Sequence, residues 1–213
     1  MKLVNWKSSL AIAVLVSCLG VVPASADTIL GPVSATTNMG ETFPLVHSFD
    51  QTGLSQNYTS GVTNFDIYVA TARHTSNPGD DWVSNAMSGA VVFDLGNIFL
   101  IDRAAVWNFG TGSGIPSFAI RDITLEGSLN NVSFFNLGAY TLTNPNGAPD
   151  TLAQLLSFST TTMRYIRMNV INTYGSNAAL GEIAFSQQVV PEPSSLLLVG
   201  ISLAGLSLKL WRK

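Results

Sequence analysis

Short runs in which apolar and polar residues alternate fill the middle of the chain. Clusters of Gly, Asn, Pro and Ser separate these runs, and no stretch there has the spacing of a long amphipathic helix. Short alternating runs between turn residues are typical of antiparallel strands. The clearest runs are residues 91–95, 98–109, 123–126, 166–170 and 183–185. The pattern therefore predicts an all-β sandwich.

The beginning of the chain has a different pattern, a single apolar stretch. Lys2 and Lys7 precede the apolar residues 10–22, and the small residues Ala24 and Ala26 follow it. A positive start, a short apolar run and a small-x-small ending are the parts of a secretory signal peptide. We therefore expect residues 1–26 to be removed by signal peptidase after Ala26.

One alternative for this segment is a lipoprotein signal. Residues 15–18 resemble a lipobox, in which Cys18 would be lipidated and would become the new N-terminus. The apolar run continues past Cys18 and a conventional cleavage site follows, so the ordinary signal peptide is the preferred interpretation. Cys18 is the only cysteine, so the mature domain can form no disulfide bond.

The end of the chain contains a second apolar segment, which has prolines before it and basic residues after it. Pro191, Glu192 and Pro193 precede it, and the two prolines prevent regular helix at that point. An uncharged apolar stretch follows, and basic residues close the chain. We expect a transmembrane helix over residues 196–210, with the basic end in the cytoplasm and the domain outside.

These three parts, in this order and at the very end of the chain, resemble the PEP-CTERM sorting signal. The resemblance covers about the last 23 residues. It implies processing by an exosortase, a membrane-embedded cysteine protease that cuts near the Pro-Glu-Pro and passes the protein to the cell surface. Such systems are associated with Gram-negative bacteria that make extracellular polysaccharide.

The charge of the middle of the chain argues against a nucleic-acid partner. Between the two apolar ends stand five arginines, no lysine and twelve acidic residues, a net charge of −7. Such a surface repels phosphate backbones. About 164 residues remain between the signal peptide and the tail, which is enough for one domain with a sizeable core.

The order of segments in this domain resembles the discoidin, or coagulation-factor C-type, family. The matching residues are 81–84 (Asp-Trp-Val-Ser), 92–96 (Val-Phe-Asp-Leu-Gly), 123–131, 164–168 (Arg-Tyr-Ile-Arg-Met) and 181–183 (Gly-Glu-Ile). The family's terminal cysteine pair is missing here, and Asn131 replaces a turn glycine. The resemblance implies a galactose-binding-like jelly roll over residues 64–187, with 27–63 as its N-terminal part or lead-in and 188–213 as the sorting signal.

Sugars are held by an aromatic face and a few polar groups in a concave site. Residues of these types stand near the predicted strand ends, and we take them as candidate ligand-binding residues: His74, Trp107, Asn108, Arg121 and Tyr174. Each also has an ordinary structural interpretation, as a core, strand-surface or loop residue.

An oxygen-rich loop is the candidate metal site. Asn77, Gly79, Asp80 and Asp81 offer the oxygen ligands that calcium prefers. The resemblance places a structural calcium near this loop, with Glu182 closing the shell. The alternative is a solvated turn with a local Asx hydrogen bond.

Catalysis is not expected. The mature domain has no cysteine, its histidines are His47 and His74, and no serine stands in a nucleophile-elbow pattern. The glycine-rich residues 110–114 lack a P-loop lysine and precede Ile-Pro, not a helix. Asp80 and Asp81 are adjacent, so their side chains would point in opposite directions on a strand.

The sequence therefore predicts an exported, non-catalytic protein, held at the inner membrane by its C-terminal helix and then released to the cell surface. Its jelly roll is expected to bind carbohydrate, including the cell's own exopolysaccharide. The alternative is a structural or adhesive matrix protein that has the fold without a sugar site. A hydrolase is the least favoured interpretation, because no catalytic constellation is visible.

Overall fold

The computed structural model describes residues 26–75, 77, 79–110, 118–145, 148 and 150–189. Residues 26–189 form one compact unit with its own core. Most of the expected signal peptide, the Pro-Glu-Pro of residues 191–193, the helix expected at 196–210 and most of the 110–114 loop lie outside the described residues. Of the residues that are described, none belongs to a helix long and apolar enough to cross a membrane.

The described residues are mostly strand, as predicted. The strands are β1 (Thr28–Leu30), β2 (Ser34–Thr37), β3 (Arg73–Thr75), β4 (Trp82–Val83), β5 (Gly89–Asn108), β6 (Ile120–Ser128), β7 (Phe135–Thr141), β8 (Asp150–Leu152), β9 (Gln154–Thr173) and β10 (Ala179–Gln187). A 3₁₀ turn, η1 (Leu45–Ser48), and one short helix, α1 (Phe65–Val69), complete the unit. The five predicted runs fall within β5, β6, β9 and β10, except that Phe109 follows the end of β5, so the all-β prediction is confirmed.

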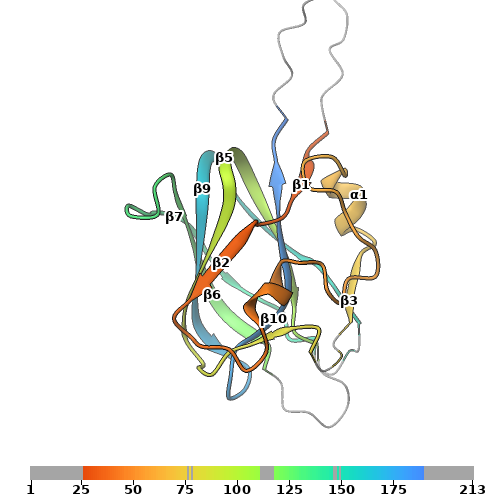
Figure 1. Cartoon of the computed structure of the whole chain (residues 1–213), viewed down its shortest axis with the longest axis vertical. Helices are drawn as coiled ribbons and strands as arrows, with labels where there is room; N and C mark the ends of the chain where they lie inside the picture. The colour runs from red at the N-terminus through yellow and green to blue at the C-terminus, as the bar shows by residue number, and fades with distance from the viewer. Residues whose placement is uncertain are drawn as a thin grey trace, which may run out of the picture. The chain divides into compact units, whose positions relative to one another are not determined.

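The strands are antiparallel and follow the order β1-β10-β5-β9-β6-β7 (Figure 1). Two strands of 20 residues, β5 and β9, pair along both of their halves, and their register shifts between Asp94 and Phe99 of β5. Gly96 lies at this shift with a φ of 81°, a conformation that glycine adopts without strain. The irregularity bends the paired strands, which therefore contribute to both sheets of the sandwich.

Each half of this bent pair has different neighbours. The first half of β5 pairs with β2, while the second half of β9 pairs with β6, which in turn pairs with β7. The second half of β5 pairs with β10, which carries β1 and β4 on its other side. The main core lies between these two sheets and includes Phe93, Ile101, Leu125, Ile166 and Phe185.

A second apolar cluster lies between β10, β5 and the segment that carries α1. Trp107 is packed there with Ile29, Phe65 and Tyr68, and the rings of Tyr68 and Trp107 meet edge to face at 6.2 Å. Asn64 begins α1, because its side chain accepts a hydrogen bond from the N–H of Ile67. Residues 27–63 are thus part of the same compact unit, since they supply β1, β2 and η1.

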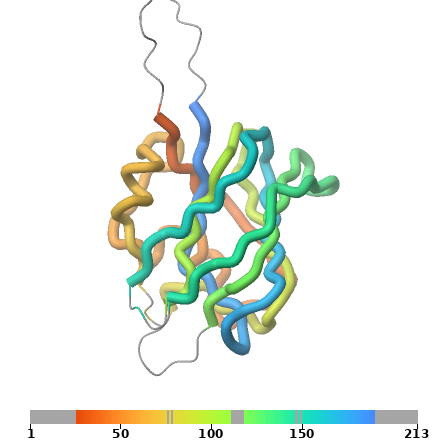
Figure 2. Tube along the Cα trace, turned by 180° about the vertical axis from the view of Figure 1, so that it is seen from behind, coloured from red at the N-terminus to blue at the C-terminus, as the bar shows by residue number. Residues whose placement is uncertain are grey.

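Both ends of the unit lie at one end of the sandwich (Figure 2). Thr28 pairs with Gln187, and Leu180, at the other end of β10, pairs with Asn108. Seven residue steps along a strand span about 24 Å. The last residues of β5 and β7 therefore lie at the end opposite to the one where the chain enters and leaves the domain.

Candidate ligand-binding site

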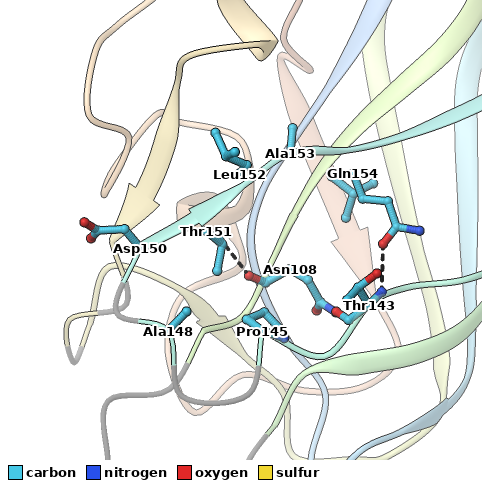
Figure 3. Close-up of a pocket in the computed structure, with 10 residues that line it drawn as sticks. Asn108, Thr143, Pro145, Ala148, Asp150, Thr151, Leu152, Ala153 and Gln154 are labelled. Atoms are coloured by element: carbon cyan, nitrogen blue, oxygen red, sulfur yellow. Dashed lines mark hydrogen bonds between the residues drawn. The ribbon is translucent and has the colours of Figure 1, made fainter.

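A pocket of about 380 Å³ opens at the end of the sandwich away from the termini. Figure 3 shows the side chains that line it. The pocket is bounded by the end of β5, the segment after β7, strand β8 and the start of β9. Its lining residues are Val106, Asn108, Thr143, Pro145, Ala148, Asp150, Thr151, Leu152, Ala153 and Gln154. The volume is within the range of small-molecule sites in proteins.

Asn108 holds the floor of this pocket together. Its side-chain nitrogen donates to the carbonyl oxygens of Ile120 (2.8 Å) and Thr143 (3.0 Å). Its side-chain oxygen accepts from the N–H groups of Phe109 and Ile120, both at 3.0 Å. One buried amide thus joins the end of β5 to the start of β6 and to the segment after β7.

Two further side chains fix the wall. The Thr151 hydroxyl donates to the carbonyl oxygen of Asn108 at 3.3 Å, and the Gln154 side-chain oxygen accepts from the N–H of Thr143 at 2.7 Å (Figure 3). Gln154 also donates to the carbonyl oxygen of Thr141 at 3.0 Å. The wall is therefore tied to the sandwich by neutral hydrogen bonds.

Of the five candidate ligand-binding residues, Asn108 lines the pocket. His74 and Trp107 are both 0% exposed. The Trp107 indole donates to the carbonyl oxygen of Ala72 at 3.0 Å, and His74 pairs in register with Thr151, so it lies on the strand beside β8. In this structure neither His74 nor Trp107 presents a surface to a ligand.

Arg121 and Tyr174 are exposed at the same end of the sandwich. Tyr174 is 37% exposed, and its hydroxyl donates to the carbonyl oxygen of Leu142, the residue before Thr143. The N–H of Leu142 donates to the carbonyl oxygen of Arg121, whose side chain forms an ion pair with Asp122. Both candidates therefore flank the pocket without lining it.

The residues that sequence reasoning missed come mainly from one loop and one short strand. Thr143, Pro145 and Ala148 lie in the turn-rich segment after β7, and Asp150 and Leu152 lie in β8. The composition of residues 143–149, rich in Asn, Pro and Gly, marks a loop. Nothing in that composition shows that the loop faces Val106 and Asn108 of a strand far away in the sequence.

The four side chains proposed as calcium ligands are not brought into one shell: Asn77, Asp80, Asp81 and Glu182. The Asn77 side chain donates to Asp80 at 3.1 Å, whereas the buried Asp81 carboxylate stands 3.5 Å from the imidazole of His74. Glu182 accepts hydrogen bonds from the N–H of Gln51 at 3.0 Å and the hydroxyl of Tyr58 at 3.4 Å. Within the described part of the chain, no three His, Cys, Asp or Glu side chains are arranged to hold a metal ion. The four side chains as they stand do not fit a calcium shell, and calcium binding stays a prediction from the family resemblance.

Burial shifts the titration of three groups in this region. It raises the pKa of the Asp81 carboxyl to about 8, with a smaller contribution from the charge of Asp80. Burial lowers the pKa of His74 and raises that of Glu182 well above its ordinary value. A neutral Asp81 beside a neutral His74 is an arrangement that suits the interior of a protein.

The end of the chain matches a known protein family. Residues 189–213 match the PEP-CTERM protein-sorting motif. The chain carries a PEP-CTERM sorting signal. This confirms the resemblance seen in the final residues and marks the chain as an exported protein. No curated protein sequence matches this PEP-CTERM chain.

The structure of the domain is similar to those of family 32 carbohydrate-binding modules. The family 32 module of Clostridium perfringens NanJ in complex with galactose has 13% identity and a TM-score of 0.51, covering 76% of this chain and 99% of that one. The second family 32 module of a GH31 protein, bound to GalNAc, has 12% identity and a TM-score of 0.50, covering 76% and 98%. The module of AlyQ in complex with 4,5-unsaturated mannuronic acid has 16% identity and a TM-score of 0.46, covering 74% and 96%.

At these identities the similarity shows the fold. The domain of this PEP-CTERM protein has the galactose-binding-like jelly-roll fold, as the sequence predicted. The similar structures are binding modules and not catalytic domains, although some belong to enzymes.

Proposed function

We propose that this exported protein binds carbohydrate, including exopolysaccharide, in the pocket lined by Asn108, Thr143 and Leu152, and that it catalyses no reaction on the sugar. The observation that carries the proposal is the position of this pocket. It opens on a carbohydrate-binding-module fold, at the end opposite to the one where the chain leaves for its sorting signal.

The chemistry of the lining supports a sugar ligand. Pro145, Ala148 and Leu152 give an apolar wall, and Thr143 and Gln154 give neutral polar groups at its edge. A pyranose ring has the matching properties, because C–H groups cover its faces and hydroxyl groups surround its rim. Mostly apolar pockets with a few fixed polar groups are the usual form of a small-molecule site.

A glycan array probed with residues 27–189 tests this proposal. These residues can be used alone, because residues 26–189 form a compact unit with its own core. Ala148→Trp fills the pocket with an indole ring and is expected to reduce binding by about tenfold or more. Ala139→Trp is the matched control, since Ala139 is exposed on β7 and does not line the pocket.

Binding that is equal in the two variants would place the sugar elsewhere on the domain, and no binding at all would contradict the proposal. Release of reducing sugar from a bound glycan would contradict its non-catalytic part.

A structural or adhesive matrix role without a sugar site is the second candidate. The described residues that line the pocket include no aromatic side chain, and the aromatic candidate Trp107 belongs to the core. Aromatic faces are common in sugar sites. Self-association of residues 27–189, together with a blank glycan array, would favour this role over the first.

For the route to the surface, we infer that signal peptidase removes residues 1–26 and that the tail anchors the chain in the inner membrane until an exosortase cuts it. The matched sorting motif supports this route. Detection of the intact chain in the cytosol, with both ends unprocessed, would contradict it.

A further inference from the structure

The charge of the pocket indicates which sugars it accepts. Among the described residues that line it, Asp150 alone has an ionisable side chain. Its carboxylate points away from Thr151 and Asn108, toward the outside of the rim (Figure 3). The interior of the pocket is therefore neutral, and the charge at its edge is negative.

The amide groups of the pocket are already bonded within the protein. Asn108 donates to Ile120 and Thr143, and Gln154 donates to Thr141 while its oxygen accepts from Thr143. The Thr151 hydroxyl donates to Asn108. A ligand carboxylate that entered the pocket would lose water without meeting a cation, and transfer of an unpaired charge out of water is strongly unfavourable.

The cations of the domain are mostly engaged elsewhere. Four of its five arginines form ion pairs: Arg103 with Asp27, Asp66 and Asp102, Arg121 with Asp122, Arg164 with Asp94, and Arg167 with Glu126. Arg73 stands opposite Leu152 in the register of β3 and β8, outside the residues that line the pocket. The net charge of −7 adds a repulsive potential for any polyanion.

Resting on the proposed function, we infer that the pocket selects uncharged sugars and excludes uronic acids, and that Asp150 contributes to this exclusion. The apolar wall of Pro145, Ala148 and Leu152 then contacts the C–H face of a neutral hexose or N-acetylhexosamine. Acidic polysaccharides meet the Asp150 carboxylate before they reach that wall.

Titration calorimetry of residues 27–189 with two sets of oligosaccharides of equal length tests the inference. One set consists of neutral hexoses and N-acetylhexosamines, and the other of uronic acids. The best neutral oligomer is expected to bind at least about tenfold more tightly than any uronate at low salt. Equal or tighter binding of a uronate would overturn the inference and leave the proposed function standing. Binding of neither set would overturn both.

A charge reversal distinguishes the effect of the Asp150 charge at the rim from the effect of the net charge of the domain. Asp150→Lys is expected to raise the affinity for uronate oligomers by about tenfold at low salt, and to change neutral binding by less than about twofold. Asp66→Lys is the control, because Asp66 is an exposed acid on α1, away from the pocket. An equal gain in both variants would show that Asp150 has no special part in the exclusion.

If a uronate does bind, Arg73→Gln shows whether Arg73 holds it. A loss of uronate binding in this variant, with the binding of neutral sugars unchanged, would show that Arg73 pairs with the uronate carboxylate. That result would overturn the inference. Uronate binding that is weak in the wild type and unchanged in this variant is the expected result.

Discussion

Asn108 joins three backbone segments through one buried amide group. These segments are the end of β5, the start of β6 at Ile120, and Thr143 after β7. Backbone groups of all three form hydrogen bonds with the Asn108 side chain. A buried polar group that loses its partner costs about 1–3 kcal/mol. The floor of the pocket therefore depends on a side chain whose own exposure is small.

Replacing Asn108 by alanine is expected to lower the free energy of unfolding by about 2–4 kcal/mol, because backbone groups at Phe109, Ile120 and Thr143 lose their partners. Urea unfolding of residues 27–189 measures the change. Asn57→Ala is the control, since Asn57 is exposed, and it is expected to cost less than about 0.5 kcal/mol. Equal losses in the two variants would contradict this account of Asn108.

The buried Asp81 predicts an unusual dependence of stability on pH. Its pKa is about 8 in the fold against an ordinary value of 3.8, so the unfolded chain releases a proton that the folded domain keeps. Stability is therefore lost as the pH rises through this window. Burial lowers the pKa of His74 from its ordinary 6.5, which acts in the opposite sense below that pH.

The effect of Asp81 is thus clearest between pH 6.5 and 8, where we expect it to lower the free energy of unfolding by about 1–2 kcal/mol. Asp81→Asn removes this contribution and is expected to reduce the slope, while Glu182, whose pKa is also raised by burial, still contributes a fall in the same direction. Urea unfolding in EDTA-containing buffer measures it, and Asp66→Asn should leave the slope unchanged. A slope that Asp81→Asn does not alter would assign the pH dependence to another group.

For single residues, the sequence predicted which types of side chain a site needs better than it predicted which of them face the pocket. Trp107 and Asn108 were both chosen because they stand near a strand end, but neighbours on a strand point to opposite sides. Trp107 packs against Tyr68 and Asn108 reaches the pocket. Which of the two faces a ligand depends on what covers each side, and α1 and its flanking segment cover the Trp107 side.

Strands β7 and β9 carry the open edges of the two sheets. Among the described pairings, β7 pairs with β6, and the first half of β9 pairs with β5. The Tyr140 hydroxyl of β7 crosses this gap and donates to the carbonyl oxygen of Ser157 in β9 at 2.8 Å. Gln154 and Thr141 make a second connection nearer to the pocket. Side chains thus join the two edges where no backbone ladder does.

Tyr140→Phe is expected to lower the free energy of unfolding by about 1 kcal/mol, because the ring stays and the hydrogen bond to Ser157 is lost. Tyr165→Phe is the matched control, since the Tyr165 ring lies under the Arg164 guanidinium and its hydroxyl is not part of this connection. Guanidinium unfolding of both variants measures the difference. A control that loses as much as Tyr140→Phe would remove the edge connection as the cause.

The long strands could be predicted from the sequence, and the short elements that complete the site could not. Apolar alternation identifies β6 and β10 because one face of each packs against the core. Strand β8 has three residues, and α1 has five, so neither is long enough to repeat the period of its pattern, about 2 residues for a strand and about 3.6 for a helix. The bend of β5 at Gly96 also has no periodic signal, and it is this bend that brings residue 108 back toward β8.

At the scale of the whole molecule, function is divided between the two ends of one domain. The chain enters at Thr28 and leaves after Gln187 at the same end of the sandwich, and the pocket opens at the other. Composition predicted this division only in outline, as apolar ends around a lysine-free middle. The position of the pocket relative to the exit follows from strand register, which a single sequence does not contain.

The sorting signal makes a prediction that does not depend on any ligand. Replacing Pro191, Glu192 and Pro193 by alanine removes the motif's defining residues and permits helix where the prolines prevented it. We expect the variant to keep its tail and to accumulate in the inner-membrane fraction, whereas the wild type appears at the cell surface as a shorter chain. Immunoblotting of cell fractions and mass spectrometry of the C-terminal peptide measure this.

Ser194→Ala combined with Ser195→Ala is the matched control, because it changes the neighbouring residues and leaves Pro-Glu-Pro intact. Processing of this control should equal that of the wild type. Release of a shortened protein from the Pro-Glu-Pro variant would show that recognition depends on the apolar segment alone. A strain that lacks the exosortase provides a second test. If the wild-type protein stays in the inner membrane of this strain while its domain is folded and exported, the retention is caused by the missing cleavage and not by misfolding.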